Sequence, residues 1–376
     1  MDTITHGIAG ALVAKSFFSE REGRLATWAV TLGSVFPDSD SFANLFINNQ
    51  LTRLEIHRGI THSFLALPVF ALLLGGLTCL ATRQRRWLFF SFLYGVGIAL
   101  HILLDLITSF GTLIWAPWSR ARAAWDLTFI IDLTFTSIVL LPQLFAWVYS
   151  GRQRAVRRAA LVWLCITGVW VAMAQLAAAL QISFPARTVA VASAVAAILL
   201  WAPAMGGQGF GWRRSLYCRV GVAALAVYLG LCGIAHQAAL ARVEDFARRT
   251  GLAVERRAAL PAPPTLWWWS GLVETPEGVY RIAIDLANPN PPASHFFANA
   301  EKNQYVEAAE TLADVKTYLW FARFPWVTYR QVDGLHIIEY RDIQFFGPRR
   351  GNDPPFTLRV SLDGQGYVVS SSLLNQ

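Results

Sequence analysis

The first third of the chain carries many histidines and aspartates within otherwise apolar sequence, and four of the seven histidines precede residue 102. These candidate functional groups are His6, Asp38, Asp40, His57, His62, His101 and Asp105. Ionisable side chains inside or at the edge of apolar segments are costly to place in a membrane, and they are therefore candidates for function.

The types and spacing of these residues are typical of a metal site. His101 and Asp105 are four residues apart, which places them on one helix face about a turn apart. Neutral imidazoles and carboxylates without thiolates form the ligand sets of hydrolytic zinc, manganese or iron sites, sometimes with two ions sharing a carboxylate. A lone histidine could instead be a packing residue, and Asp38 and Asp40 could form a turn or helix cap. For the seven groups together, a metal site is the stronger hypothesis.

The segments that must position these groups are long apolar runs. A composition of 55% hydrophobic and 15% charged residues over 376 positions is typical of a membrane protein. Runs near the ~20 residues that cross a bilayer occur at 63–81, 87–110, 127–149, 159–181, 188–204 and 216–235. The shorter runs 4–18 and 25–36 could be tilted, re-entrant or half-buried helices. We predict a polytopic α-helical membrane protein with about six to eight transmembrane or re-entrant helices.

The arginines indicate the orientation of the chain. They cluster in alternate connections, around residues 21–24, 83–86, 152–158 and 213–219, so the positive-inside rule places these loops in the cytoplasm. The net charge of +8 therefore reflects topology, and no nucleic-acid partner is expected. This topology places the N-terminus and residues after about 241 in the periplasm, with the histidine and aspartate groups near the outer face. No basic stretch precedes the first apolar run, so we expect that run to remain in the mature protein.

The last part of the chain, residues 241–376, changes to a pattern typical of a soluble α+β domain. Residues 278–286, 334–340 and 356–362 read as strands, residues 302–324 as a helix, and Asp363-Gly364 as a hairpin turn. Trp267, Trp268 and Trp269 could anchor this domain at the membrane interface. His236, His295 and His336 read as ordinary interfacial or surface residues, and the sequence of the domain contains no recognisable catalytic motif.

Several stretches resemble a known family. They are MDTITHGIAGALV, GSVFPDSDSF, HRGITHS and GIALHILLDLITSFGT, followed by WAPWS and DLTFIIDLTF. They resemble the membrane-bound metal-dependent hydrolases of the YdjM type, inner-membrane proteins of bacteria, some of them under LexA control. The resemblance covers roughly the first 135 residues and implies a membrane-embedded hydrolase core at residues 1–135. From the apolar runs and the change of pattern we expect additional transmembrane helices at 136–240 and a periplasmic α+β domain at 241–376.

The family is in turn similar to zinc-dependent phospholipase C and P1-type nucleases, whose sites include a His-x-x-x-Asp pair on one helix. By that resemblance the metal ligands would be His6, Asp38, His57, His62, His101 and Asp105. Asp40 would be a further ligand or would orient a histidine. The N-terminal amine is a ligand in those secreted enzymes, but no counterpart of it is expected here. Asp126 and Asp132 match acidic family positions and would support ligands or cap a helix, with a ligand role also open.

The function expected from this site is metal-dependent hydrolysis of a phosphoester, with membrane lipids as partners and a phospholipid or lipid phosphate as the substrate class. The cofactor would be a divalent metal, zinc first and manganese or iron as alternatives. Asp40 could act as general base, and Arg58 could hold a phosphate oxygen or contact lipid headgroups. The alternatives are a metal-ion or proton transporter that uses the same groups, and a metal-stabilised membrane scaffold without turnover. We make no prediction of the oligomeric state.

Overall fold

The protein consists of a bundle of helices followed by two β-sheets. The computed structural model describes residues 1–376 except 152–153, 180–185, 206–209, 264, 347–354 and 375–376. The helices of the bundle are α1 (Thr3–Phe17), α2 (Ser19–Val35), α3 (Gln50–Ile56), α4 (Leu67–Thr82), α5 (Trp87–Leu106), α6 (Leu133–Val148), α7 (Ala155–Ala179), α8 (Ala186–Met205) and α9 (Arg214–Thr250). Two 3-10 helices, η1 (Phe36–Leu45) and η2 (Ile60–His62), connect α2 to α3 and α3 to α4.

Each predicted apolar run forms a helix, but the predicted number of crossings is not confirmed. By length and composition, three helices among the described residues can cross a membrane, namely α5, residues 155–172 of α7, and α9. Residues 50–62 together with α4 add a fourth candidate, bent by 72° at a short break. Helices α1 and α2, with 15 and 17 residues, and α6, with 16, are shorter than a full crossing usually requires. The apolar runs therefore identify the helices, whereas the length of each helix decides whether it can span the membrane.

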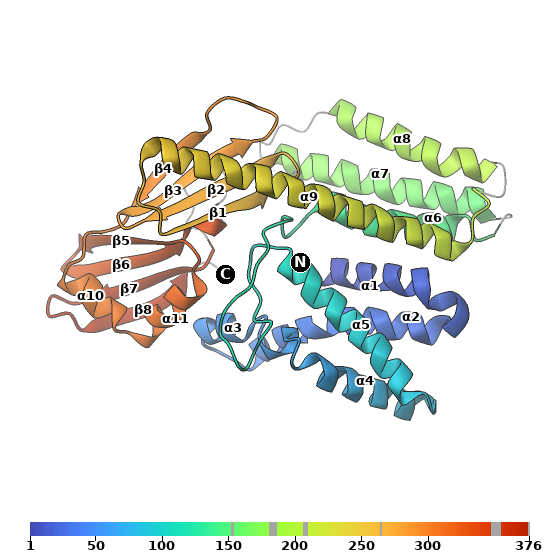
Figure 1. Ribbon diagram of the computed structural model, residues 1–376, viewed down its shortest axis with the longest axis horizontal. Coiled ribbons are helices and arrows are strands. Elements are labelled where there is room, and N and C mark those ends of the chain that lie inside the picture. Colours follow the sequence, from blue (N-terminus) through green and yellow to red (C-terminus); the bar gives the residue numbers. More distant parts are fainter. Residues whose placement is uncertain (152–153, 180–185, 206–209, 264, 347–354, 375–376) are drawn as a thin grey trace.

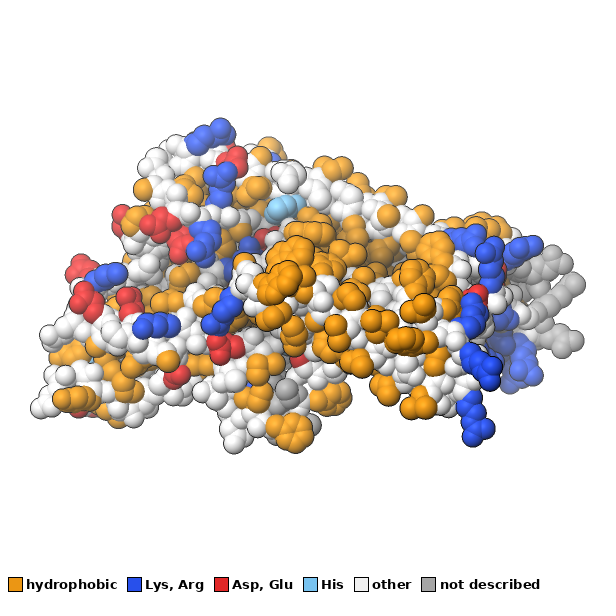
Figure 2. Space-filling model, turned by 60° about the horizontal axis from the view of Figure 1, so that its bottom comes forward, with side chains coloured by type: hydrophobic (Ala, Val, Ile, Leu, Met, Phe, Trp, Pro, Cys, Tyr) orange, Lys and Arg blue, Asp and Glu red, His pale blue; other side chains and the backbone are white. Residues whose placement is uncertain are grey.

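The charged and apolar surfaces separate along the molecule. Hydrophobic side chains cover the middle of the helical part, while lysine and arginine side chains gather at the end far from the sheets (Figure 2). The arginine-bearing turns between α1 and α2 and between α4 and α5, and the start of α9, lie at that end (Figure 1). An apolar belt between a basic end and a polar domain is the surface expected of a membrane protein.

Small residues allow α2 and α5 to pack closely, and this packing brings their polar groups together. A Cβ added at Gly97 would lie 2.3 Å from the carbonyl oxygen of Val30, and one at Gly33 would lie 2.7 Å from that of Tyr94. Both positions therefore require glycine. The contact places the carboxyl end of α2 beside the second half of α5, where His101 lies.

The C-terminal part, called here the β domain (residues 256–374), contains two four-stranded antiparallel sheets. The first is β1 (Arg256–Ala262), β2 (Trp268–Thr275), β3 (Gly278–Asp285) and β4 (Ala293–Ala298), in that order. The second is β5 (Pro325–Val332), β6 (Leu335–Asp342), β7 (Thr357–Leu362) and β8 (Val368–Leu374). The far half of α9 packs on the first sheet through Ala239 and Val243, so one continuous helix joins the bundle to the β domain (Figure 1).

Most predicted elements of this domain are present, with three corrections. The predicted helix at residues 302–324 is two helices, α10 (Gln304–Glu310) and α11 (Ala313–Phe321), which cover the second sheet. Trp267 and Trp268 are half exposed, but Trp269 is buried against α9 and cannot anchor the domain at an interface. His336 is likewise buried, stacked on Tyr305.

The predicted hairpin turn is present between β7 and β8. The carboxylate of Asp363 accepts hydrogen bonds from the backbone N–H groups of Gln365 and Tyr367, which fixes the turn. The four cysteines, which all lie among the described residues, form no disulfide. Cys165 is exposed rather than packed in a core, and it lies on the apolar helix α7.

Candidate metal centre

Four of the predicted ligands meet at one point in the bundle. Helix α5 contributes His101 and Asp105 from adjacent turns, as their spacing predicts. Asp38 comes from η1, immediately after α2, and His62 ends η2. One ligand atom from each of these residues lies within 4.8 Å of the other three. His62, His101 and Asp105 are fully buried, and Asp38 is partly exposed.

The separations between these atoms fit a single small cation. The Nε2 atoms of His62 and His101 are 3.0 Å apart. Asp105 Oδ2 lies 3.3 Å from His62 Nε2 and 3.5 Å from His101 Nε2. Asp38 Oδ1 lies 3.5 Å from His101 Nε2 and 3.8 Å from His62 Nε2. A tetrahedral zinc site with bonds of about 2.0–2.2 Å would place its ligand atoms roughly 3.3–3.6 Å apart. The cluster could therefore hold a metal ion with little movement.

The hydrogen bond on the far side of His101 leaves its Nε2 lone pair facing the cluster, and the contacts of His62 Nδ1 are compatible with the same tautomer. His101 Nδ1 lies 2.8 Å from the carbonyl oxygen of Ser34, which can only accept, so Nδ1 carries the proton. His62 Nδ1 lies 3.6 Å from Asp40 Oδ2 and 3.0 Å from the hydroxyl of Thr61. A proton on this Nδ1 likewise leaves Nε2 without one. With Nδ1 protonated in both rings, the two Nε2 lone pairs would face each other at 3.0 Å, and a cation between them would remove the repulsion.

The two oxygens of Asp105 have different surroundings. Oδ1 lies within hydrogen-bond distance of the amino group of Met1 at 2.5 Å, Arg58 Nη2 at 2.9 Å and His6 Nε2 at 3.2 Å. Oδ2 is buried without a hydrogen-bond partner among the described residues, and it is the oxygen that faces His62 and His101. A buried carboxylate oxygen without a donor is costly, and a cation would satisfy it.

Two of the predicted ligands lie outside this set of four. His6 is fully buried, stacks on His101 with ring centroids 3.7 Å apart, and contacts Asp105 from the side opposite the cluster. His57 is one-third exposed, and its Nδ1 lies 3.4 Å from Asp40 Oδ1. The structure therefore places His6 behind the cluster and His57 at its edge.

Asp40 links the loop around the cluster. Its Oδ2 accepts the backbone N–H of Arg58 at 2.8 Å and lies near His62, while its Oδ1 faces His57. Burial raises the pKa of Asp40, but the two histidines and the Arg58 N–H outweigh burial, so the net pKa is lowered. The pKa of Asp38 is also lowered, because His62, His101 and the Thr3 hydroxyl outweigh its burial. Both carboxylates are therefore ionised near neutral pH.

Comparison with known proteins identifies the part of the chain that holds this cluster. Residues 1–179 match the family described as YdjM inner membrane protein. The resemblance read from the motifs is thereby confirmed, and the YdjM match contains all four residues of the cluster. The β domain lies beyond it. No curated protein and no solved structure matched the chain in the other two comparisons. The similarity to phospholipase C and P1 nuclease stays a prediction.

The structure corrects two expectations about residues 1–179, the part of the chain that matches the YdjM family. Arg58 does not lie at the lipid interface, because its side chain is only 4% exposed. Its guanidinium contacts Asp105 and donates to the hydroxyl of Thr108 at 3.2 Å. An amino group does lie beside the cluster, since that of Met1 contacts Asp105, although no counterpart of the amine ligand of the secreted enzymes was expected.

The two acidic residues after α5 have structural partners. Asp132 caps α6 by accepting the N–H groups of Thr134 and Phe135, so the predicted helix-terminus role is confirmed. Asp126 instead forms a bidentate ion pair with Arg323 of the β domain, at 2.8 and 2.9 Å. Neither carboxylate belongs to the four-residue cluster.

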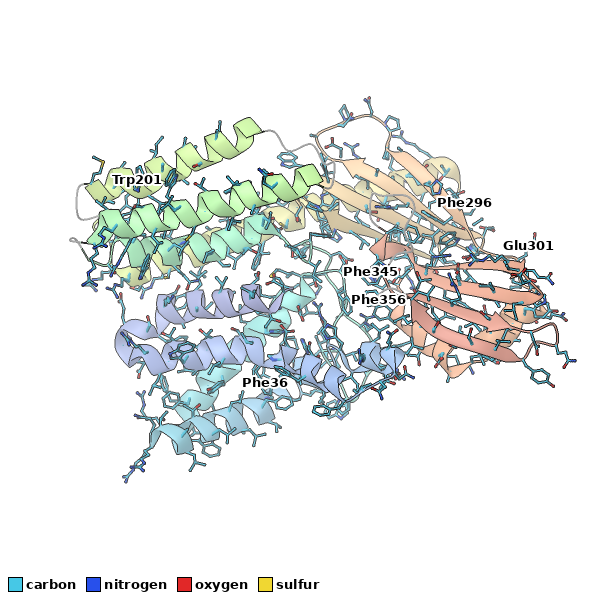
Figure 3. All side chains as sticks on the ribbon, turned by 180° about the vertical axis from the view of Figure 1, so that it is seen from behind. Phe36, Trp201, Phe296, Glu301, Phe345 and Phe356 are labelled. Carbon is cyan, nitrogen blue, oxygen red and sulfur yellow. The ribbon has the colours of Figure 1, made fainter. Side chains whose placement is uncertain are left out.

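The β domain closes one side of the site with aromatic rings. Phe110 follows α5, and its ring lies 5.5 Å from that of His57 and 4.8 Å from the Arg58 guanidinium carbon. On its other side Phe110 contacts Phe321, Phe345 and Phe356 of the β domain. Phe345 and Phe356 lie where the β domain meets the helices (Figure 3). We call these four phenylalanines the aromatic wall.

The sequence contained little signal for these supporting contacts. Three supporting groups reach the site only through tertiary contacts with residues far away in the chain. They are Arg323, Phe321 and the Ser34 carbonyl. A weak signal existed in Gly97, four residues before His101, because a glycine within a helix often marks close packing.

Proposed function

We propose that this protein is a membrane-bound metal-dependent hydrolase that cleaves a phosphoester of a membrane lipid. The observation that carries the proposal is Asp105 Oδ2, which has no hydrogen-bond partner in the described part of the chain and is buried beside two imidazole nitrogens and Asp38. In this ligand set of imidazole and carboxylate, a divalent ion, zinc first, would act as a Lewis acid and supply an activated water. His62, His101, Asp38 and Asp105 would hold it.

Lipid as the substrate class is supported by a groove next to the cluster. A hollow of about 480 Å³ is lined mainly by apolar side chains of α2, η1, α4 and α5. Asp38 and Thr3 also line it, and the Thr3 hydroxyl donates to Asp38 at 2.6 Å. Leu32 and Phe42 are about half and two-thirds exposed, so the groove opens toward the surrounding bilayer. A lipid with its acyl chain in this groove would have its headgroup beside Asp38, where the four ligands meet. Phe36, which also lines the groove, lies at the end of α2 toward α4 (Figure 3).

Proton transfer is best assigned to His57 together with Asp40. His57 is partly exposed at the edge of the site, and Asp40 faces its Nδ1 at 3.4 Å, which orients the ring with Nε2 free. Asp40 itself is almost buried and already accepts the Arg58 N–H, so a direct role as base is less favourable. Arg58 would fix Asp105 rather than bind phosphate.

The orientation of the site follows from the arginine distribution. Because basic turns gather at the end of the bundle opposite the β domain, we infer a periplasmic location for the cluster and the β domain. Substrate would then enter from the outer leaflet, with its acyl chains remaining in the bilayer.

The test is hydrolysis of a panel of phospholipids, lipid phosphates and nucleotides by detergent-purified protein. We expect turnover of a lipid that is removed by chelation and by Asp38→Asn, and that returns when zinc or manganese is added to the chelated wild type. Lack of hydrolysis by metal-replete protein would sink the proposal. Metal-dependent ion flux in proteoliposomes that is abolished by Asp105→Ala would instead identify a transporter.

A further inference from the structure

A second hollow lies at the basic end of the bundle, far from the metal cluster. Its volume is about 570 Å³, and it is bounded by the carboxyl halves of α1 and α6, by α2 from Ser19 to Thr31, and by the amino end of α9. Its apolar lining includes Trp28 and Trp147, which are 61% and 43% exposed. Trp147 lies at the end of α6, where an exposed tryptophan is typical of the headgroup region, whereas Trp28 lies in the middle of α2. We call this hollow the basic cleft.

The basic cleft contains three cations that have no acidic partner among the described residues. Lys15, Arg24 and Arg214 line it, and none of them forms an ion pair with a carboxylate of the described part of the chain. Lys15 is half-buried and donates to the side-chain oxygen of Gln143 at 2.9 Å, which leaves two of its three N–H donors free. Arg214 donates to the carbonyl oxygen of Ser150 at 3.3 Å.

The two acidic side chains in the first turn of α2 are already engaged elsewhere. Glu20 accepts the backbone N–H of Ser215, and Glu22 pairs with Arg86 at the α4–α5 turn. They therefore leave the charge of Lys15 and Arg24 uncompensated. A half-buried ammonium beside apolar walls is stable when an anion completes its hydrogen bonds.

We propose that the basic cleft binds the headgroup of one anionic phospholipid of the cytoplasmic leaflet, with Lys15, Arg24 and Arg214 around the phosphate. The apolar lining and the two exposed tryptophans favour a lipid over a free phosphate ion, because they offer a surface for acyl chains that inorganic phosphate cannot use. This site is independent of the proposed hydrolase activity.

The test is native mass spectrometry of the detergent-purified full-length chain with added phosphatidylglycerol or phosphatidylcholine. We expect one phosphatidylglycerol to be retained in preference to phosphatidylcholine. Binding should weaken roughly tenfold in Arg24→Gln/Arg214→Gln, since each basic group near a membrane surface contributes severalfold to anionic lipid binding. Lys15→Met should add to this loss, and the double variant keeps the test valid if Lys15→Met fails to fold.

The matched control is Arg83→Gln/Arg85→Gln, which removes two positive charges from the same end of the bundle outside the cleft. An equal loss of binding in this control would show general attraction and overturn the proposal. The proposal is also overturned if phosphatidylcholine binds as well as phosphatidylglycerol, or if millimolar inorganic phosphate displaces the lipid completely.

Discussion

Two buried carboxylates, Asp105 in the helical bundle and Glu339 in the β domain, are both surrounded by cations but differ in how fully they are satisfied. Glu339 receives donors on both oxygens from Arg330, Arg341 and Arg359. Asp105 receives all its donors on Oδ1, while Oδ2 faces two imidazoles and has no donor among the described residues. A saturated carboxylate stabilises a fold, whereas a half-saturated one keeps capacity for a ligand.

The largest effect should come from exchanging one carboxylate for its amide in each region. Asp105→Asn should lower zinc affinity by more than the roughly 10–100-fold typical of residues that only support a ligand. Glu339→Gln should leave zinc affinity unchanged and lower the stability of the β domain. The measurement is zinc competition with a chelator, accompanied by thermal unfolding. Equal zinc affinity in both variants would show that the difference between the half-satisfied Asp105 and the saturated Glu339 has no bearing on metal binding.

The next effect concerns the ion pair that joins the two regions. Arg323→Met leaves Asp126 buried without its partner, so we expect a loss of about 3–5 kcal/mol in the free energy of unfolding. The exposed pair of Arg257 and Glu244 is the control, because Arg257→Met should cost under about 1 kcal/mol. Denaturant unfolding in detergent measures both. Similar losses would mean that the contact of Asp126 with Arg323 does not fix the β domain against the bundle.

A smaller effect should distinguish the four metal ligands from Asp40, which supports them. Asp40→Asn keeps the four clustered atoms but weakens the hold on His62 and on the Arg58 backbone, so zinc affinity should fall roughly 10–100-fold without being abolished. Ser41→Ala is the control, since its hydroxyl makes only a 3.4 Å contact with Asp40. Complete loss of zinc in Asp40→Asn would make Asp40 a ligand.

The smallest effect is the pH dependence of the β domain. Burial raises the pKa of Glu339, but Arg341, Arg359 and Arg330 outweigh burial, so its net pKa lies below the ordinary value of 4.5. The charged form therefore adds stability above that value, and this contribution is lost as pH falls toward the lowered pKa. Unfolding measured from pH 7 to 3 should show a steeper acid decline in the wild type than in Glu339→Gln. Parallel curves would contradict the assignment.

The sequence predicted the helices and the cluster well because both depend on local patterns. Apolar runs mark helices, and the four-residue spacing of His101 and Asp105 puts them on one face. The number of crossings could not be predicted, since a run such as 4–18 does not reveal whether its helix spans. The helix expected at 302–324 has apolar periodicity throughout, but the chain turns at Thr311 and Leu312.

The division of roles within the site could not be predicted because it depends on distant contacts. The sequence treats His6, His57 and His62 alike, and only the tertiary packing puts His62 in the cluster, His6 behind Asp105 and His57 beside Asp40. The inward direction of Arg58 depends in the same way on Asp105 and Phe110.

The most direct test of the central claim is the metal content of the detergent-purified protein by elemental analysis, beside a His101→Ala/Asp105→Ala variant. We predict at least one equivalent of zinc, manganese or iron per chain in the wild type and its loss in the folded variant. Absence of metal in the wild type, even after reconstitution with each ion, would contradict the claim and leave the cluster as a buried polar network.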